Sequence, residues 1–325
     1  MGSELHVVLG ASGGTGSAVV RALVEAGQRV VAVNRGGDAP VQDGVARLAA
    51  ELATADGARA AVAGASVVYH CAQPEYVRWA AEFPGLTRTI ADAVEAEGAK
   101  LVFADNVYMY DPGAGPISES SPLISTALGR LRQEMAEELL QRHRQGRLSV
   151  AIGRSSDYYG PFGTGSFLGE RLFEAIVAGR KAQWMSTLDV PHTCSYLPDM
   201  GRALVTLGMR PDADGRPWIL PAAEPLTGAA FIERAGHVAG TSPKPSVITP
   251  MVMRVAGLFV PLLRSYREMT YQWTTPFVLD ASAFERTFGP FAVTGHDEAL
   301  AATVAWFRGR AIPRPPRNPE PATPG

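Results

Sequence analysis

Short apolar segments alternate with amphipathic ones along the first half of the chain. Leu5–Leu9 is apolar and β-branched, and after it apolar residues recur at helical spacing from Ala18 to Ala26. Gly27 lies just past this predicted helix, and Arg29–Asn34 has the pattern of a second buried strand. A strand, a helix and a second strand in this order form a βαβ unit. The start of the chain therefore predicts the first part of a parallel sheet.

The same alternation continues to about residue 153. Further strands are predicted at 45–49, 66–72, 99–104 and 148–153, with helices between them near 57–62, 84–97 and 126–145. Strands separated by helices at this regular interval predict an α/β fold with a doubly wound parallel sheet of the Rossmann type. Ligands of such sheets bind beyond the carboxyl ends of the strands.

The pattern changes after residue 153. Glycine and proline then separate short strands and helices, including strands at 193–197 and 218–220 and a helix capped by Asp199 that ends near Gly208. We expect residues 1–153 to form a dinucleotide-binding domain and residues 154–311 a smaller substrate-binding lobe, some of whose elements return to the first domain. Residues 312–325 contain six prolines and almost no apolar residues, which predicts a disordered tail.

A glycine-rich turn joins the first strand to the first helix. Gly10, Gly13 and Gly16 are spaced by two residues each, unlike the G-x-G-x-x-G of the common dinucleotide fingerprint. Glycine lets the backbone approach a pyrophosphate, whose charge the amide groups of a helix N-terminus stabilise. A tight turn without a ligand is the simpler alternative. Because the flanking elements are all in place, we predict a cofactor site formed by Gly10, Ser12, Gly13, Gly14, Thr15 and Gly16.

Composition and charge exclude several classes of protein. Charged residues make up 19% and the net charge is −2, so we expect no nucleic-acid partner. Cys71 and Cys194 are the only cysteines, and no secretory signal precedes the first strand, so we expect a cytoplasmic protein without a metal site. The longest apolar run, Met251–Leu263, contains Arg254 and Pro261 and is shorter than the roughly twenty residues that a bilayer span needs. No membrane association is expected.

Five segments in order resemble the extended short-chain dehydrogenase/reductase superfamily, in its NAD(P)-dependent epimerase/dehydratase branch. They are the glycine turn and residues 68–72, 107–110, 154–161 and 196–203. Arg154–Pro161 is similar to the family's R-x-x-x-x-Y-G-P at the start of the substrate lobe, and Tyr196–Ala203 to its Y-V-x-D-V-A-R-A. The resemblance extends from Leu5 to about Phe307. It implies an NAD(P)-dependent enzyme that acts on a small molecule.

The end of the second strand distinguishes the two cofactors. Members of the family that prefer NAD usually have an acid there, which binds the ribose hydroxyls, whereas this chain has Asn34 and Arg35. Arginine suits a 2′-phosphate, so we predict NADP (NADPH) in preference to NAD. The alternative for Arg35 is a solvated loop charge. The other cofactor contacts implied by the resemblance are Glu51, Leu52, Cys71 and Ala72.

The three catalytic positions of the family are all changed. The family uses Tyr-x-x-x-Lys on the helix after the fifth strand, where the lysine lowers the pKa of the tyrosine. None of the nine tyrosines here has a lysine four residues later. The matching positions hold Leu128 and Arg132, and Asn106 replaces the helper Ser or Thr. Arg132 could still hold ribose hydroxyls, but Leu128 cannot transfer a proton.

Another group must therefore supply the proton, or the substrate must need none, as with an activated C=C or an iminium. We rank Tyr158 and Tyr108 first because their segments should both face the nicotinamide. Asp105, Tyr110 and His192 are the other candidates. Each also has a plainer role, since Tyr110 could pack in the core, Asp105 could cap a turn and His192 could be a loop residue.

Three functions stay open. The first is an NADP-dependent oxidoreductase or epimerase-like enzyme with an atypical acid/base arrangement. The second is a non-redox isomerase, lyase or cyclase on the same fold, and the third is a catalytically silent dinucleotide-binding sensor or partner protein. The intact glycine turn and the full-length substrate lobe favour an enzyme over a silent protein. The resemblance also favours a homodimer, with Leu86–Glu97 and Leu128–Leu139 as its interface.

Overall fold

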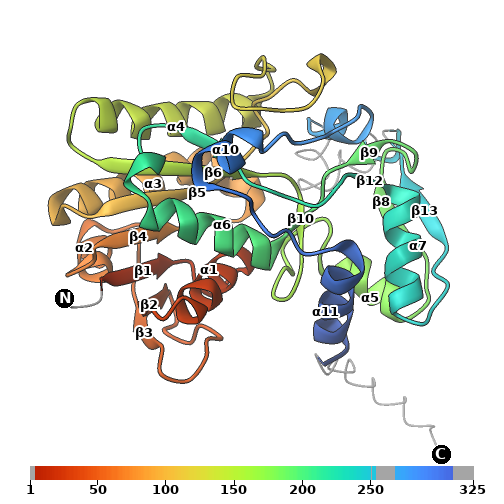
Figure 1. The fold of residues 1–325 in the computed structure, drawn as a ribbon, viewed down its shortest axis with the longest axis horizontal. Helices are drawn as coiled ribbons and strands as arrows, with labels where there is room; N and C mark the ends of the chain where they lie inside the picture. Colours follow the sequence, from red (N-terminus) through yellow and green to blue (C-terminus); the bar gives the residue numbers. More distant parts are fainter. Residues whose placement is uncertain (1–3, 250, 254–267, 310–325) are drawn as a thin grey trace, which may run out of the picture.

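The structure is a computed structural model that describes residues 4–249, 251–253 and 268–309 (Figure 1). The predicted tail at 312–325 and most of the apolar run Met251–Leu263 lie outside the described residues.

A seven-stranded parallel sheet forms the centre of the molecule. Its order is β11-β6-β5-β4-β1-β2-β3. The strands are β1 (Leu5–Leu9), β2 (Arg29–Asn34), β3 (Ala46–Ala49), β4 (Val67–His70), β5 (Lys100–Asn106), β6 (Ser149–Ser155) and β11 (Pro217–Ile219). The direction of progression reverses between β1 and β4, and helices lie on both faces. The Rossmann-type, doubly wound α/β fold predicted from the pattern is confirmed.

Each face of the sheet has its own apolar core. Helices α1 (Gly14–Glu25) and α6 (Leu197–Met209) cover one face, and Val8 of β1 belongs to the core between them and the sheet. Helices α2 (Ala55–Val62), α3 (Trp79–Glu97) and α4 (Ala127–Arg144) cover the other face, whose core contains Val7. Val7 and Val8 are neighbours in β1 and belong to opposite cores, as the two-residue period of a strand requires. Burial on both faces explains why the inner strands of the sheet are largely apolar, whereas the edge strand β3 is mostly exposed.

Two elements from the second half of the chain, β11 and α6, belong to the sheet and to the helical layer on one of its faces. Strand β11 pairs with β6, with Trp218 opposite Gly153, and α6 packs along α1. Gly201 makes this helix contact close, because a Cβ there would lie 2.5 Å from the Ala18 carbonyl oxygen. The chain therefore leaves the sheet after β6 and returns to it before entering the second lobe again.

The second lobe lies beside the carboxyl ends of the strands, on the right of Figure 1. Its helices are α5 (Glu170–Val177), α7 (Gly228–Val238) and α11 (His296–Gly309), and its strand pairs are β7 (Tyr158–Tyr159) with β10 (Ser195–Tyr196), β9 (Pro191–His192) with β12 (Leu226–Thr227), and β8 (Ala182–Met185) with β13 (Pro245–Ile248). Trp184, Phe173 and Phe231 are among the large side chains of its core. Helix α10 (Ser282–Phe288) and the 3-10 turns Tyr76–Arg78, Pro112–Ala114, Pro211–Ala213 and Thr270–Trp273 complete the described elements.

Helix α3 begins five residues earlier than predicted, at Trp79 instead of Pro84. Proline lacks the amide hydrogen of an interior helical residue and therefore suggested a first turn. Trp79 and Phe83 are only 5% and 2% exposed, and the Trp79 Nε1 donates to the Pro74 carbonyl at 3.2 Å. Burial of these two rings extends the helix through the proline.

Asp199 does not cap α6, contrary to the sequence prediction. The N-cap is Tyr196, and Asp199 is the third residue of the helix. Its carboxylate accepts hydrogen bonds from Thr294 N at 2.8 Å and Thr294 Oγ1 at 2.7 Å. The residue thus joins α6 to the segment before α11.

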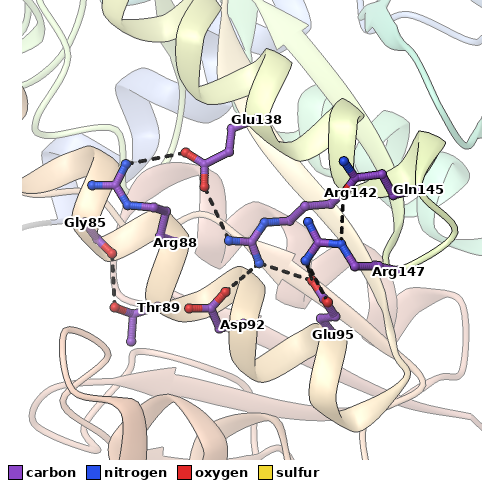
Figure 2. Close-up of polar contacts among 9 residues, drawn as sticks. All are labelled: Gly85, Arg88, Thr89, Asp92, Glu95, Glu138, Arg142, Gln145 and Arg147. Atoms are coloured by element: carbon purple, nitrogen blue, oxygen red, sulfur yellow. Dashed lines mark hydrogen bonds and ion pairs between the residues drawn. The ribbon is translucent and has the colours of Figure 1, made fainter.

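A network of ion pairs connects the outer parts of α3 and α4 (Figure 2). Arg142, whose side chain is 9% exposed, contacts Asp92 at 2.6 Å and both Glu95 and Glu138 at 3.3 Å. Burial opposes the charge of Arg142, but Asp92 and Glu138 outweigh it and raise its pKa. The homodimer through these helices stays a prediction.

We expect Arg142→Ala to lower the free energy of unfolding by about 2 kcal/mol, because three carboxylates lose the cation they share. Denaturant unfolding would measure the change. Arg144→Ala is the matched control on the same turn, since Arg144 and its partner Glu137 are 55% and 59% exposed and such pairs contribute little. Equal losses in the two variants would show that the network does not hold the helices together.

Candidate active site

A cavity of about 850 Å³ lies beyond the carboxyl ends of β1, β2 and β4. Its walls include Gly10, Ser12, Gly13, Gly14, Thr15, Asn34, Arg35, Glu51, Leu52, Cys71 and Ala72, all of which the sequence assigned to a cofactor. Residues of α3 and of the loop 162–165 close its other sides. Gly16 and Arg132 are the predicted cofactor residues that are not on its walls.

Two glycines of the turn are required by close backbone contacts. Gly10 has φ +81°, and a Cβ there would lie 2.7 Å from the backbone of Ala72. A Cβ on Gly16 would lie 2.2 Å from the Gly10 carbonyl oxygen. Gly16 therefore has a packing role: it lets α1 start directly against the end of β1, which brings the first turn of the helix to the cavity.

The N-terminus of α1 fits an anionic group. Its N-cap, Gly13, has no side chain to occupy the amide groups, and the first turn contains no acidic residue. Backbone amides and the helix dipole then favour a negative charge in the cavity, and the glycines leave room for it. The residues present fit the pyrophosphate of a dinucleotide.

The end of β2 carries a cation on the cavity wall. Arg35 is exposed there and makes no ion pair with any described residue. The neighbouring Asn34 donates from Nδ2 to Asp38 at 2.8 Å, which turns that carboxylate toward Asn34, while the Asn34 Oδ1 is buried without a partner. This edge of the cavity therefore offers the positive charge of Arg35 to a ligand.

Arg132, which we expected could hold ribose hydroxyls, is buried in the protein and is not among the residues that line the cavity. Its side chain is 3% exposed and its guanidinium lies over the rings of Phe83 and Phe103, at 4.6 and 5.0 Å from their centroids. Its Nε donates to Asp105 Oδ1 at 2.7 Å. Leu128, one helical turn earlier, packs against the same core. The dyad positions thus hold an apolar side chain and a buried ion pair.

Asp105 also differs from its expected role as a turn cap. It lies in β5, its side chain is fully buried, and its second oxygen accepts from Arg154 Nε at 2.9 Å. Arg154 also contacts the hydroxyl of Tyr110, which is buried in the core as expected. Burial opposes the charge of Arg154, but Asp105 and Tyr110 outweigh it and raise its pKa. We call Asp105, Arg132 and Arg154 the buried triad.

Tyr108 and Asn106 lie near the exit of β5 but are not on the cavity walls. The ring of Tyr108 is stacked 6.2 Å from that of Trp79, and its carbonyl accepts from the Tyr271 hydroxyl at 2.7 Å. The Asn106 Oδ1 accepts from Tyr108 N at 3.2 Å. Asn106 thus shapes the turn that carries Tyr108.

Tyr158 is the one catalytic candidate, among the described residues, that lines the cavity. Strand β7 holds it there, because Tyr158 pairs with Ser195 of β10 while the next residue, Tyr159, is buried in the second core. The side chain therefore stands where the two lobes meet.

His192 is buried in β9 and is therefore not a loop residue, which was the alternative to a catalytic role. Its Nε2 lies 3.1 Å from Asp157 Oδ2, and its Nδ1 lies 3.2 Å from the Gln272 carbonyl oxygen. Sequence reasoning missed Asp157, which directly precedes Tyr158. A polar residue next to a cavity residue was the available signal, but its pairing with a histidine 35 positions away depends on how the lobe folds.

In the described part of the chain, no three His, Cys, Asp or Glu side chains are grouped as metal ligands. Over the same residues, no helix combines the length and apolarity that crossing a membrane requires.

Comparison with known proteins supplies a family and a fold. The model of the NAD dependent epimerase/dehydratase family matches residues 6–219. A search of curated proteins found no match.

Solved structures of epimerases and of a dehydratase superpose on most of the chain. UDP-N-acetylglucosamine 4-epimerase from Bacillus cereus has a TM-score of 0.75 at 15% identity, covering 94% of this chain and 97% of the other. UDP-glucose 4-epimerase from Thermus thermophilus, in complex with NAD, has 0.74 at 17%, covering 94% and 99%. A dTDP-glucose 4,6-dehydratase double mutant from Streptomyces venezuelae, with NAD bound, has 0.75 at 20%, covering 94% and 97%. At these identities the likeness shows the fold.

Proposed function

Because the chain belongs to the NAD-dependent epimerase/dehydratase family, whose members are enzymes of the short-chain dehydrogenase/reductase type, we propose that it is an NADP(H)-dependent oxidoreductase or epimerase-like enzyme. It acts on a mid-sized, partly apolar metabolite without the Tyr–Lys dyad. The observation that carries this proposal is the glycine-walled cavity at the start of α1 with the exposed Arg35 at its rim. The similar solved structures that contain NAD support a nicotinamide dinucleotide as the cofactor, without distinguishing NADP from NAD.

Different residues of the cavity bind different parts of the cofactor. Amides at the start of α1 bind the pyrophosphate, Arg35 binds the 2′-phosphate of the adenosine ribose, and Leu52 packs on the adenine. A bound nicotinamide dinucleotide supplies or accepts the hydride. Tyr158 lines the wall where the lobes meet, which suits the nicotinamide end and the substrate. Leu128 and the buried triad provide no acid at the usual place.

Replacing Arg35 by Asp should raise the Kd of NADPH by about 10- to 100-fold, because a charge-assisted contact becomes a repulsion. The Kd of NADH should change little or fall. Quenching of tryptophan fluorescence would measure both constants.

Arg78→Gln is the control for this experiment. Arg78 lines the same cavity but is paired with Glu82, so its loss should affect NADPH and NADH alike. Unchanged selectivity of Arg35→Asp would show that Arg35 does not contact the 2′-phosphate. A wild-type protein that binds neither dinucleotide would contradict the proposed function.

A catalytically silent dinucleotide-binding protein is the second candidate, and the burial of Arg132 in the triad favours it. The two candidates differ in turnover. Incubation of the protein and NADP(H) with a panel of ketones, enones, imines and nucleotide sugars separates them, provided that both cofactor absorbance and substrate conversion are followed, since a silent protein binds the cofactor but changes neither. A non-redox isomerase or lyase, like an epimerase that regenerates its cofactor, would convert a substrate of such a panel without net consumption.

A further inference from the structure

A second cavity, of about 300 Å³, has walls from α1, α6, α11 and the loop at Pro161 and Phe162. One water molecule occupies roughly 30 Å³ in the liquid, so this space admits a small organic molecule. We propose that the second cavity is a binding site for a compact molecule with a single carboxylate group. The inference goes beyond the proposed function and does not depend on it.

Arg21 brings an unpaired cation to the second cavity. It lines the cavity and makes no ion pair with a described residue, although Glu25 is one helical turn away. Its guanidinium carbon lies 4.5 Å from the centroid of the Phe162 ring, and its Nε is buried without a hydrogen-bond partner. The ring covers one face of the guanidinium, and the N–H donors in its plane stay unbonded. Such a planar set of donors matches the two oxygens of a carboxylate.

Tyr196 adds an uncharged donor to the same cavity. The residue is 8% exposed, and its hydroxyl has no hydrogen bond to a described residue. Burial, with the charges of Asp199 and Glu298, raises the pKa of Tyr196 to about 12, against the opposing charge of Arg202. The phenol therefore keeps its proton at neutral pH and can donate it to an anion in a hydrogen bond.

The other side-chain donors on the walls already have partners. The Ser17 hydroxyl donates within α1, at 3.0 Å. Thr294 Oγ1 and Arg202 Nη2 donate to the Asp199 carboxylate, at 2.7 and 2.9 Å. The guanidinium and the phenol described above are thus the donors that a ligand would engage.

Two carboxylates on the walls limit the charge of the ligand. Glu25 of α1 and Glu298 of α11 are exposed, and neither forms an ion pair with a described residue. They repel a second negative charge and attract a positive one. A phosphate or a dicarboxylate is therefore less suited to the cavity than a monocarboxylate, and an added cationic group favours binding.

Phe162 separates the second cavity from the cofactor cavity. Among the described residues it alone lines both. Its φ of +65° lies in the left-handed region, which is unusual for a bulky side chain. Its ring contacts the Arg21 guanidinium and the Trp306 ring, whose centroid is 5.0 Å away. Because the walls are otherwise distinct, we expect both cavities to accept ligands at the same time.

Titration with 4-fluorobenzoate, followed by ¹⁹F NMR, tests the site without cofactor or substrate. We expect saturable binding to the wild type, and Arg21→Gln should raise the Kd by about 10-fold or more. Arg216→Gln is the matched control, since Arg216 also lies over an aromatic ring, Trp218 at 4.1 Å, but lines neither cavity. Absence of saturable binding, or wild-type affinity in Arg21→Gln, would overturn the proposal.

Related compounds test the preferred charge. 4-Fluorobenzamide has the shape of the benzoate without its charge and should bind about 10-fold more weakly or worse. In competition with 4-fluorobenzoate, 4-(aminomethyl)benzoate should bind more tightly than terephthalate, and Glu298→Gln should narrow that difference. Equal affinity for the charged and uncharged compounds would contradict the proposed class of ligand.

Two neighbouring alanines of α11 locate the bound compound. Both are exposed, but only Ala302 lines the second cavity. Ala302→Phe should therefore fill part of the cavity and weaken binding of 4-fluorobenzoate by about 10-fold or more, whereas Ala301→Phe should leave it unchanged. Wild-type affinity in Ala302→Phe would place the compound elsewhere and refute the site.

Saturating NADPH separates this inference from the proposed function. A compound in the second cavity should stay bound, whereas competitive displacement would place it in the cofactor cavity and overturn the inference. A wild-type protein that binds 4-fluorobenzoate but no dinucleotide would refute the proposed function alone. One that binds NADPH but no carboxylate would refute the second site alone.

Discussion

Replacing Asp105 by Asn is expected to lower the free energy of unfolding by about 3–5 kcal/mol. The carboxylate is fully buried and is the counter-charge of two arginines whose side chains are 3% and 7% exposed. An amide of the same shape would leave both cations unpaired and would point an N–H group at one of them. Thermal or denaturant unfolding, followed by circular dichroism, measures the loss.

Two further variants make this experiment specific. Asp56→Asn is the control, since Asp56 also pairs with an arginine but both side chains are exposed, at 95% and 61%, and its loss should not be measurable. Arg132→Met should cost less than Asp105→Asn, because the pair of Asp105 with Arg154 survives and the unpartnered Nη1 of Arg132 is removed. If Asp105→Asn were as stable as the wild type, the triad would not be a structural ion cluster.

Gly16→Ala is expected to raise the Kd of NADPH by more than about 100-fold, a loss of about 3 kcal/mol of binding free energy. The added Cβ would meet three backbone atoms of Gly10 and Ala11 at 2.2, 2.8 and 2.9 Å. None of these atoms belongs to a flexible side chain, so the first turn of α1 must move away from the end of β1. The amides that face the pyrophosphate move with it, and the Tm falls as well.

Gly13→Ala separates the two effects of such a change. A Cβ at this position has Gly10 O at 3.5 Å as its nearest neighbour, which is an ordinary contact. We expect the Tm to stay near that of the wild type while NADPH binding weakens, because the methyl group enters the space beside the helix amides. Fluorescence titration and thermal unfolding of both variants measure this contrast. Wild-type affinity in Gly16→Ala would refute the role of the close contact.

Most of the fold was predictable from local patterns. The first six strands and the helices between them follow from apolar runs and helical periodicity, which reflect burial of each element on the sheet. The start of α3 was not predictable in this way. Proline at position 84 signals a boundary, and only the packing of Trp79 and Phe83 shows why the helix begins before it.

In the candidate site, too, local sequence predicts some residues, and the position of the others depends on tertiary packing. The predicted cofactor residues that line the cavity follow one another in short segments at strand ends, so the sequence places them together. Arg132 carried a usable signal, because it lies four residues after Leu128 and three before Met135, on the apolar face of α4. A cation on that face needs a buried acid, and Asp105 at the end of β5 is the one it has. The contact of Asp157 with His192 joins the segment between β6 and β7 to β9 through the packing of the second lobe, which no local pattern encodes.

Because α6 and β11 are translated after the other strands of the sheet, the sheet is completed late during synthesis. The face of the sheet that carries Val8, Tyr69 and Val102 is covered by α1 and by α6, and α6 ends only at Met209. While the first 153 residues leave the ribosome, the part of that face that α6 will cover has no partner, and the sheet edge next to β6 stays open until β11 is made. Such contacts between distant segments form late. Most residues that line the cavity thus precede residue 90, but the sheet that supports them is completed only after about two thirds of the protein has been translated.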